Sequence, residues 1–95
     1  MSRETITVPG ALSSYIHSVG VREDSYLAAL REETARHPAA EMQISPEQGQ
    51  LMALLVRMLG ARKTLDIGVF TGYSAMAVAK AMGPGGTVVA LDVSE

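Results

Sequence analysis

Residues 64–92 read TLDIGVFTGYSAMAVAKAMGPGGTVVALD, and this stretch decides the fold. Residues 64–68 are a short strand candidate that enters a turn, and residues 87–92 form an almost continuous apolar run. Such a run is typical of a parallel strand that is covered on both faces. The alanine-rich residues 73–82 between them predict a helix, which the GPGG of residues 83–86 ends. Strand, helix and strand within about thirty residues predict a βαβ unit and an α/β fold.

Three helices are predicted upstream of this unit. An i, i+3, i+4, i+7 stripe of apolar residues marks the first over residues 11–20, and the second fits residues 24–37. The third begins after Ser45, a natural N-cap that is followed by proline. We therefore divide the chain into an N-terminal helical region, residues 1–44, and the incomplete start of an α/β domain, residues 45–95. The apolar stripe of the third helix is expected to be core: Leu51, Leu54, Leu55, Met58 and Leu59.

The composition excludes several classes of protein. Of the 95 residues, 47% are hydrophobic and 19% are charged, which is unlike a disordered chain. Ten acidic residues outnumber eight basic ones, so we expect no nucleic-acid partner. Apolar stretches end well short of the ~18 residues that a membrane helix needs, so no membrane partner is expected. The absence of cysteine fits a reducing cytoplasm, where we expect the protein to be located.

The turn DIGVFTGYS, residues 66–74, predicts a ligand site. Ligands of open parallel sheets bind beyond the carboxyl ends of the strands. Gly68 lets the backbone approach a ligand closely, and Gly72 leaves the first amides of the following helix uncovered. Asp92 ends the second strand near the ~20-residue spacing at which an acid reaches a ribose hydroxyl. The pattern predicts a ligand that contains a nucleoside, with its ribose on Asp92.

The same turn narrows the choice of ligand. Phe70 stands where a dinucleotide fingerprint needs its second glycine, and Tyr73 stands where a phosphate-binding loop needs its lysine. Asp66 would repel a phosphate group and attract a cation. A nucleoside that bears a positively charged amino acid group fits these features, and S-adenosylmethionine is such a molecule.

Residues 42–51, MQISPEQGQL, and residues 65–74, LDIGVFTGYS, resemble the small cation-dependent O-methyltransferases. That family includes the caffeoyl-CoA and catechol O-methyltransferases, and the resemblance covers roughly residues 15–92. It implies a Rossmann-like (class I) methyltransferase fold, of which this chain holds the N-terminal helices and the first βαβ unit, with the sheet incomplete. It also implies S-adenosylmethionine as cofactor and a divalent cation in the complete fold, with no metal ligand and no catalytic residue in this segment.

The resemblance also implies roles for individual residues. The equivalent of Met42 lies along the cofactor, and those of Asp66 and Gly68 hold its methionine end. Ser74 contacts the carboxylate of the cofactor and Asp92 takes the ribose hydroxyls. The family often has glutamate in place of Asp66, which shortens the reach by one methylene. The candidate cofactor-binding residues are Met42, Asp66, Gly68, Gly72, Tyr73, Ser74 and Asp92.

Several of these residues also have a purely structural interpretation. Tyr73 is as well suited to packing as to a ligand contact, and Ser45 needs only a capping role. The run from Arg31 to Glu33 is interpreted as a solvated helix face. His17 and His37 are placed on separate helices without a partnering carboxylate pattern, and we expect no ligand role for them.

The function expected from the resemblance is methyl transfer from S-adenosylmethionine to a hydroxyl of a small phenolic or catechol-type substrate, by a homodimer. A second hypothesis is a non-catalytic nucleoside-binding or subunit-association module that uses the helices of residues 11–37. A third, an NAD-dependent oxidoreductase, is disfavoured by Phe70. With the strand faces only partly covered, the chain by itself is expected to self-associate and not to catalyse methyl transfer.

Overall fold

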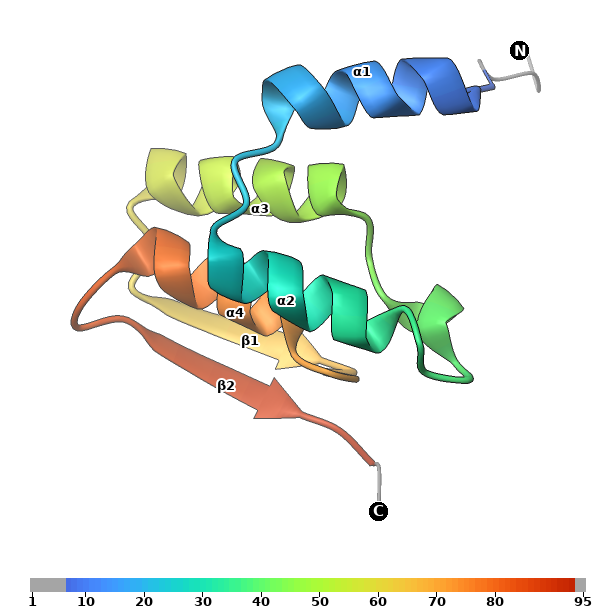
Figure 1. Cartoon of the computed structure of the whole chain (residues 1–95). Coiled ribbons are helices and arrows are strands. Elements are labelled where there is room, and N and C mark those ends of the chain that lie inside the picture. The colour runs from blue at the N-terminus through green and yellow to red at the C-terminus, as the bar shows by residue number, and fades with distance from the viewer. Residues whose placement is uncertain (1–6, 94–95) are drawn as a thin grey trace, which may run out of the picture.

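The strand–helix–strand unit predicted around residues 64–92 forms one side of the molecule (Figure 1). The computed structural model describes residues 7–93. In chain order its elements are α1 (Gly10–Gly20), α2 (Ser25–Thr34), the 3-10 helix η1 (Ala40–Met42), α3 (Pro46–Leu59), β1 (Lys63–Ile67), α4 (Tyr73–Met82) and β2 (Thr87–Leu91). No helix in this part of the chain is long and apolar enough to cross a membrane.

The two strands are parallel, as the βαβ pattern predicts. Their register sets Lys63 opposite Thr87 and Ile67 opposite Leu91. Gly68 N then donates to Leu91 O at 2.8 Å, which ties the start of the β1–α4 turn to the end of β2. The α/β arrangement and the parallel pairing are thus confirmed.

All the helices lie on one side of this two-stranded sheet (Figure 1). Helix α4 contacts both strands, and α2 and α3 pack against α4. The core therefore surrounds α4, and its buried apolar residues are Leu27, Tyr73, Ala77, Val78 and Met82. Helix α1 contacts α3 and lies at the edge of the molecule (Figure 1).

Local sequence signals account for the helix ends. Asp24 accepts a hydrogen bond from Leu27 N at the start of α2, and Ser45 accepts one from Gln48 N at the start of α3. Gly60 ends α3 in the left-handed conformation, with φ of 61°, which glycine adopts without steric cost. Helix α2 ends at Thr34, whereas the sequence predicted a helix to about residue 37. After Thr34 the chain continues as a tighter turn, with Arg36 N donating to Glu33 O and His37 N donating to Thr34 O. Pro38 directly restricts only His37.

The apolar stripe expected to be the core of α3 is instead exposed. Its members range from 46% exposed at Leu55 to 80% at Leu59. Helix α3 packs against α4 through a neighbouring face on which Gly49 is buried and Ala53 is half-buried. Small residues let two helices approach closely, so the face with the smaller side chains makes the contact and the larger side chains face outward.

The strands are covered on one face only, so the expectation that β2 is covered on both faces is wrong for the described residues. Along β1 the half-buried Thr64 and Asp66 alternate with Leu65 and Ile67, which are 61% and 75% exposed. This alternation is the two-residue period of a strand with one solvent-facing side. The expectation of partly covered strand faces is confirmed.

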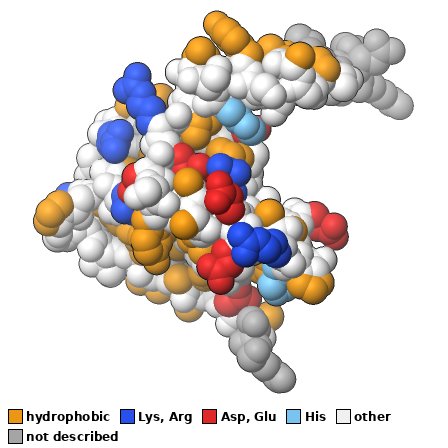
Figure 2. All heavy atoms as spheres, in the orientation of Figure 1, with side chains coloured by type: hydrophobic (Ala, Val, Ile, Leu, Met, Phe, Trp, Pro, Cys, Tyr) orange, Lys and Arg blue, Asp and Glu red, His pale blue; other side chains and the backbone are white. Residues whose placement is uncertain are grey.

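Charged side chains of both signs lie side by side over the region of α2 (Figure 2). Several of them are paired with one another, as Asp24 is with Lys80 at 2.7 Å. His17, for which no carboxylate partner was expected, has its Nε2 atom 2.5 Å from Glu47 Oε2 and so links α1 to the first turn of α3. No local sequence pattern indicates this contact, because the two residues lie thirty positions apart.

Candidate cofactor site

The β1–α4 turn combines three residues in the left-handed conformation. Gly68 has φ of 83°, Phe70 has φ of 54° and Gly72 has φ of 94°. A Cβ atom at either glycine would have no neighbour within 4 Å, so backbone conformation and not crowding requires glycine at these positions. Phe70 has a side chain, so its left-handed conformation costs about 1–3 kcal/mol of folding free energy. Strain of this kind persists only where the surroundings hold it, and it is concentrated at ligand sites.

Asp92 and His37 hold Phe70 in this conformation. Asp92 Oδ2 accepts a hydrogen bond from Phe70 N at 2.8 Å, and its Oδ1 accepts one from Val93 N at 2.7 Å. The ring of His37 meets the ring of Phe70 edge-on, with 5.2 Å between centroids. His37 lies beyond the end of α2 and not on a helix as expected. The acid predicted from its spacing therefore lies directly beside the turn.

Asp66 and Ser74 meet across the turn. Ser74 Oγ donates a hydrogen bond to Asp66 Oδ2 at 2.9 Å, so the end of β1 and the first turn of α4 are joined. The residue at the N-cap of α4 is Gly72, which has no side chain to accept from the amides that follow. A carboxylate thus lies next to an open helix N-terminus, which carries partial positive charge. This combination can bind an ammonium group and a carboxylate group of one ligand.

A small hollow lies against the turn. It is lined by Met42, Gln43, Ile44, Gly68, Val69, Phe70, Thr71, Tyr73 and Ser74. Four of the seven predicted residues line it: Met42, Gly68, Tyr73 and Ser74. The remaining three do not line the hollow but belong to the same turn or to the strand ends beside it: Asp66, Gly72 and Asp92. Met42 is 60% exposed, which leaves its thioether available to a ligand.

Five lining residues are not among the candidates: Gln43, Ile44, Val69, Phe70 and Thr71. Within the described residues, Gln43 Oε1 is buried and has no hydrogen-bond partner. A buried amide oxygen without a partner costs about 1–3 kcal/mol, and a polar ligand that reaches this atom from the hollow would remove that cost. This feature fits a site for a polar cofactor. The sequence signal was weak, since a glutamine before a helix cap is common.

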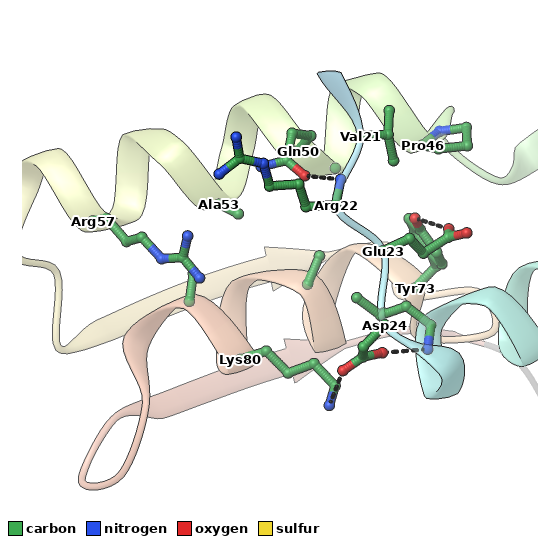
Figure 3. A pocket seen from close by; sticks show the side chains of 14 residues that line it. Val21, Arg22, Glu23, Asp24, Pro46, Gln50, Ala53, Arg57, Tyr73 and Lys80 are labelled. Carbon is green, nitrogen blue, oxygen red and sulfur yellow. Dashed lines mark hydrogen bonds and ion pairs between the residues drawn. The ribbon is translucent and has the colours of Figure 1, made fainter. Parts of the chain in front are cut away.

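Tyr73 also reaches Glu23, which lies just before α2 (Figure 3). Its side chain is 4% exposed, and its hydroxyl donates to Glu23 Oε2 at 2.5 Å. Arg31 donates to both oxygens of Glu23, at 2.9 Å from Nε to Oε2 and 2.9 Å from Nη2 to Oε1. The expectation of a solvated helix face holds for Glu32 and Glu33, which are exposed, but Arg31 is half-buried and paired. The Glu23–Arg31 pair joins the segment before α2 to a residue eight positions later on the helix.

These bonds shift the pKa values of Glu23 and Tyr73. Hydrogen bonds from Arg31 hold the pKa of the Glu23 carboxyl below its ordinary value, against the opposing effect of burial. Burial and the bond to the Glu23 carboxylate raise the pKa of Tyr73 well above its ordinary value of 10. Tyr73 is therefore a hydrogen-bond donor to a carboxylate at neutral pH and not an anion.

A second, separate hollow is drawn in Figure 3 and lies between the start of α2, α3 and α4. Most of the labelled polar groups are paired there: Asp24 with Lys80, Glu23 with Tyr73 and Arg22 N with Gln50 Oε1. The pairs hold the N-terminal segment to α3 and α4. The turn that carries Asp66 and Ser74 is thus the better candidate for a cofactor site.

Comparison with known proteins identifies the family. A model of a family described as O-methyltransferase matches residues 16–95. The chain belongs to the O-methyltransferase family. Among its curated relatives, caffeoyl-CoA O-methyltransferase 1 of Zea mays is 44% identical over 77 residues, which are 81% of this chain and 30% of the relative. Caffeoyl-CoA O-methyltransferase 2 of Petunia hybrida is 41% identical over 86 residues, which are 88% of this chain and 36% of the relative. The chain thus spans about a third of the length of these O-methyltransferases.

Solved O-methyltransferase structures share the fold. The Bacillus cereus O-methyltransferase in complex with SAH superposes with a TM-score of 0.75 at 38% identity, over 90% of this chain and 39% of that one. The SAH-bound methyltransferase PaMTH1 of Podospora anserina gives a TM-score of 0.83 at 26% identity, over 96% of this chain and 42% of that one. These likenesses confirm the partial Rossmann-like methyltransferase fold. The resemblance inferred from residues 42–51 and 65–74 is confirmed with it.

Proposed function

We propose that this chain supplies the part of an S-adenosylmethionine site that binds the amino acid end of the cofactor, in an enzyme that methylates a hydroxyl of a small phenolic or catechol-type substrate. The observation that carries the proposal is the Asp66–Ser74 pair at the open N-terminus of α4. Relatives named caffeoyl-CoA O-methyltransferases and solved structures with bound SAH or SAM support it.

The predicted site residues would divide the cofactor among them. Asp66 would attract the ammonium group, and the uncapped amides at the start of α4, with Ser74, would bind the carboxylate. Gly68 would let this end of the ligand approach the backbone, and Gly72 keeps the helix end open. When bound, S-adenosylmethionine supplies a methyl group on a positively charged sulfur for attack by a substrate oxygen.

The other predicted contacts would position the nucleoside and the thioether. Asp92, at the end of β2 beside the turn, would take the ribose hydroxyls, and Met42 would lie along the cofactor. The buried Gln43 Oε1 would gain a partner. Tyr73 would contribute by packing, since its hydroxyl is bound to Glu23.

The described residues do not fit a divalent cation. No group of three or more His, Cys, Asp or Glu side chains in residues 7–93 is arranged to hold a metal ion. We therefore propose cation dependence for the whole enzyme and not for the described residues of this chain. We also propose the domain division at residues 44 and 45, with an N-terminal helical region before the incomplete cofactor-binding domain; residues 1–6 of that region lie outside the described part of the chain.

We propose a homodimeric, cytoplasmic enzyme that acts on a small molecule and has no nucleic-acid or membrane partner. The exposed apolar side chains of α1 and α3 support the homodimer, because contiguous apolar patches commonly mark association surfaces. The second candidate is a non-catalytic nucleoside-binding or subunit-association module, and the position of Asp92 beside the turn, where it would take a ribose, favours its nucleoside-binding form.

Calorimetric titration of the protein with S-adenosylhomocysteine and with NAD tests the proposal. We expect S-adenosylhomocysteine to bind more tightly. The Asp66→Asn variant keeps a partner for Ser74 but removes the negative charge, and should weaken this binding by about 1.5–3 kcal/mol, roughly 10- to 100-fold. Asp24→Asn is the matched control, since Asp24 pairs with Lys80 away from the turn and asparagine also caps helices. Tighter binding of NAD, or equal affinity for both variants, would contradict the proposal.

A further inference from the structure

We propose that residues 23–37, the α2 segment, act as a clamp that holds the β1–α4 turn in the shape that binds the cofactor, with Thr34 as the key positioning residue. The inference rests on the proposed function for the identity of the ligand. Its basis is that three residues of this segment contact three residues of the turn region: Glu23 with Tyr73, Thr34 with Thr71, and His37 with Phe70.

Thr34 makes the central contact. It is 3% exposed and is the buried polar residue of the described core. Its Oγ1 lies 2.8 Å from Thr71 Oγ1 and 2.8 Å from Leu30 O, so the hydroxyl is fixed by its own helix and hydrogen-bonded to the turn. A valine has the same shape as threonine but lacks the hydroxyl. The hydroxyl is therefore the part of Thr34 that joins α2 to the turn, through Thr71.

Two further contacts, made by residues before and after Thr34, restrict movement of the turn. Tyr73, the first residue of α4, is held through its hydroxyl by Glu23, which Arg31 fixes in turn. The ring of Phe70, the strained residue, rests edge-on against His37. The α2 segment thus reaches the turn near its middle, at its strained residue and at the helix that follows.

The other bonds of the turn lie toward its ends and its backbone. Gly68 N donates to Leu91 O, Ser74 Oγ donates to Asp66 Oδ2, Gly72 N donates to Val69 O at 3.0 Å, and Phe70 N donates to Asp92. Gly68 and Gly72 give the turn more backbone freedom than residues with side chains would, so a contact at Thr71 adds order. A loop that is ordered before its ligand arrives does not lose that freedom on binding, so affinity increases. The clamp would supply this preorganisation from a segment some forty residues distant in sequence.

Thr34→Val tests the clamp, because it removes the hydroxyl and keeps the shape. Thr34→Ser is the rescue variant, and Thr64→Val is the matched control. Thr64 Oγ1 is also buried, on β1, and has no hydrogen-bond partner among the described residues. Amide hydrogen exchange without ligand reports on the turn, and calorimetry with S-adenosylhomocysteine reports on binding.

We expect Thr34→Val to speed exchange of the Phe70 and Gly72 amides by about fivefold and to weaken S-adenosylhomocysteine binding by a similar factor, as for one hydrogen bond. Exchange in β1 and β2 should stay unchanged, Thr34→Ser should restore both values, and Thr64→Val should alter neither.

Two results would overturn the clamp. One is unchanged turn exchange in Thr34→Val, and the other is acceleration that is uniform over the turn and the strands, which would show a general loss of stability. Equal affinity of wild type and Thr34→Val would likewise overturn its role in binding. If the wild type does not bind S-adenosylhomocysteine, the proposed function fails, and the exchange data still decide whether the α2 segment orders the turn.

Discussion

The bond between Tyr73 and Glu23 gives a quantitative prediction for stability. Tyr73→Phe removes one hydroxyl from a side chain that is 4% exposed and leaves its carboxylate partner, 10% exposed, with Arg31 alone. A hydrogen bond to a charged group contributes about 1.5–3 kcal/mol, and the low exposure of both partners leaves little screening by solvent. We therefore expect Tyr73→Phe to lower the free energy of unfolding by about 2 kcal/mol, measured by urea denaturation at pH 7.

A double-mutant cycle with Glu23→Gln assigns this loss to the pair. Each single variant should be destabilised, and the double variant should lose about 1–2 kcal/mol less than the sum. Glu23→Gln alone also weakens the hydrogen bonds that Arg31 donates to Glu23. The Arg31 side chain is 35% exposed, so these bonds contribute about 1 kcal/mol or less to stability. Additive losses, or a Tyr73→Phe variant as stable as the wild type, would refute the reasoning.

The pH dependence has a defined sign. The folded-state pKa of Glu23 is lowered from 4.5, chiefly by the hydrogen bonds from Arg31. A carboxylate with a lowered pKa stabilises the folded state above its unfolded pKa, and that stabilisation is lost as the pH falls through the lowered value. The wild type should therefore lose part of its stability below pH 4.5, and Glu23→Gln should lack that part of the acid transition.

The remaining predictions concern a helix cap and the open sheet face. Ser45→Ala removes the oxygen that accepts from Gln48 N, and should cost about 1 kcal/mol of stability in urea denaturation. It should leave the affinity for S-adenosylhomocysteine intact, and a large loss of affinity at unchanged stability would show that Ser45 has a binding role. Ile67→Lys places a charge on a strand position that is 75% exposed, and should reduce self-association measured by light scattering. A monomeric wild type, or association that the substitution leaves unchanged, would contradict the expectation that this face drives it.

The sequence predicted most of the local structure because the signals were local. Ser45 and Gly60 mark the two ends of α3, and the predicted helix over residues 73–82 coincides with α4. Asp92 was selected by its spacing from Gly68 and its place at the end of the second strand, and it lies beside the turn. Each of these predictions depends on residues that are close in sequence or on one topological rule.

The remaining errors concern contacts between distant residues. The Leu and Met stripe of α3 was assigned to the core because of its periodicity, but a second face with Gly49 and Ala53 packs against α4. Periodicity reveals that a helix has apolar faces, and it does not tell which face meets which neighbour. The Tyr73–Glu23 bond likewise joins residues fifty positions apart, and charged residues near a helix start are usually solvated.

The charges at the turn discriminate between ligand classes. An open helix N-terminus favours an anion by about 0.3–1 kcal/mol, and this alone would suit a pyrophosphate. Asp66 lies within one hydrogen bond of Ser74 in the first turn of the same helix. A phosphate bound there would meet this carboxylate at close range, at a cost of about 1–4 kcal/mol per pair of charges at 4 Å. Because this repulsion is the larger contribution, we expect the turn to disfavour a purely anionic group.

A zwitterionic amino acid group would avoid this conflict, since its ammonium would face Asp66 and its carboxylate would face the amides. We therefore propose that the turn favours the amino acid end of S-adenosylmethionine over the pyrophosphate of a dinucleotide, and Asp66→Asn should narrow the difference in affinity between the two ligands.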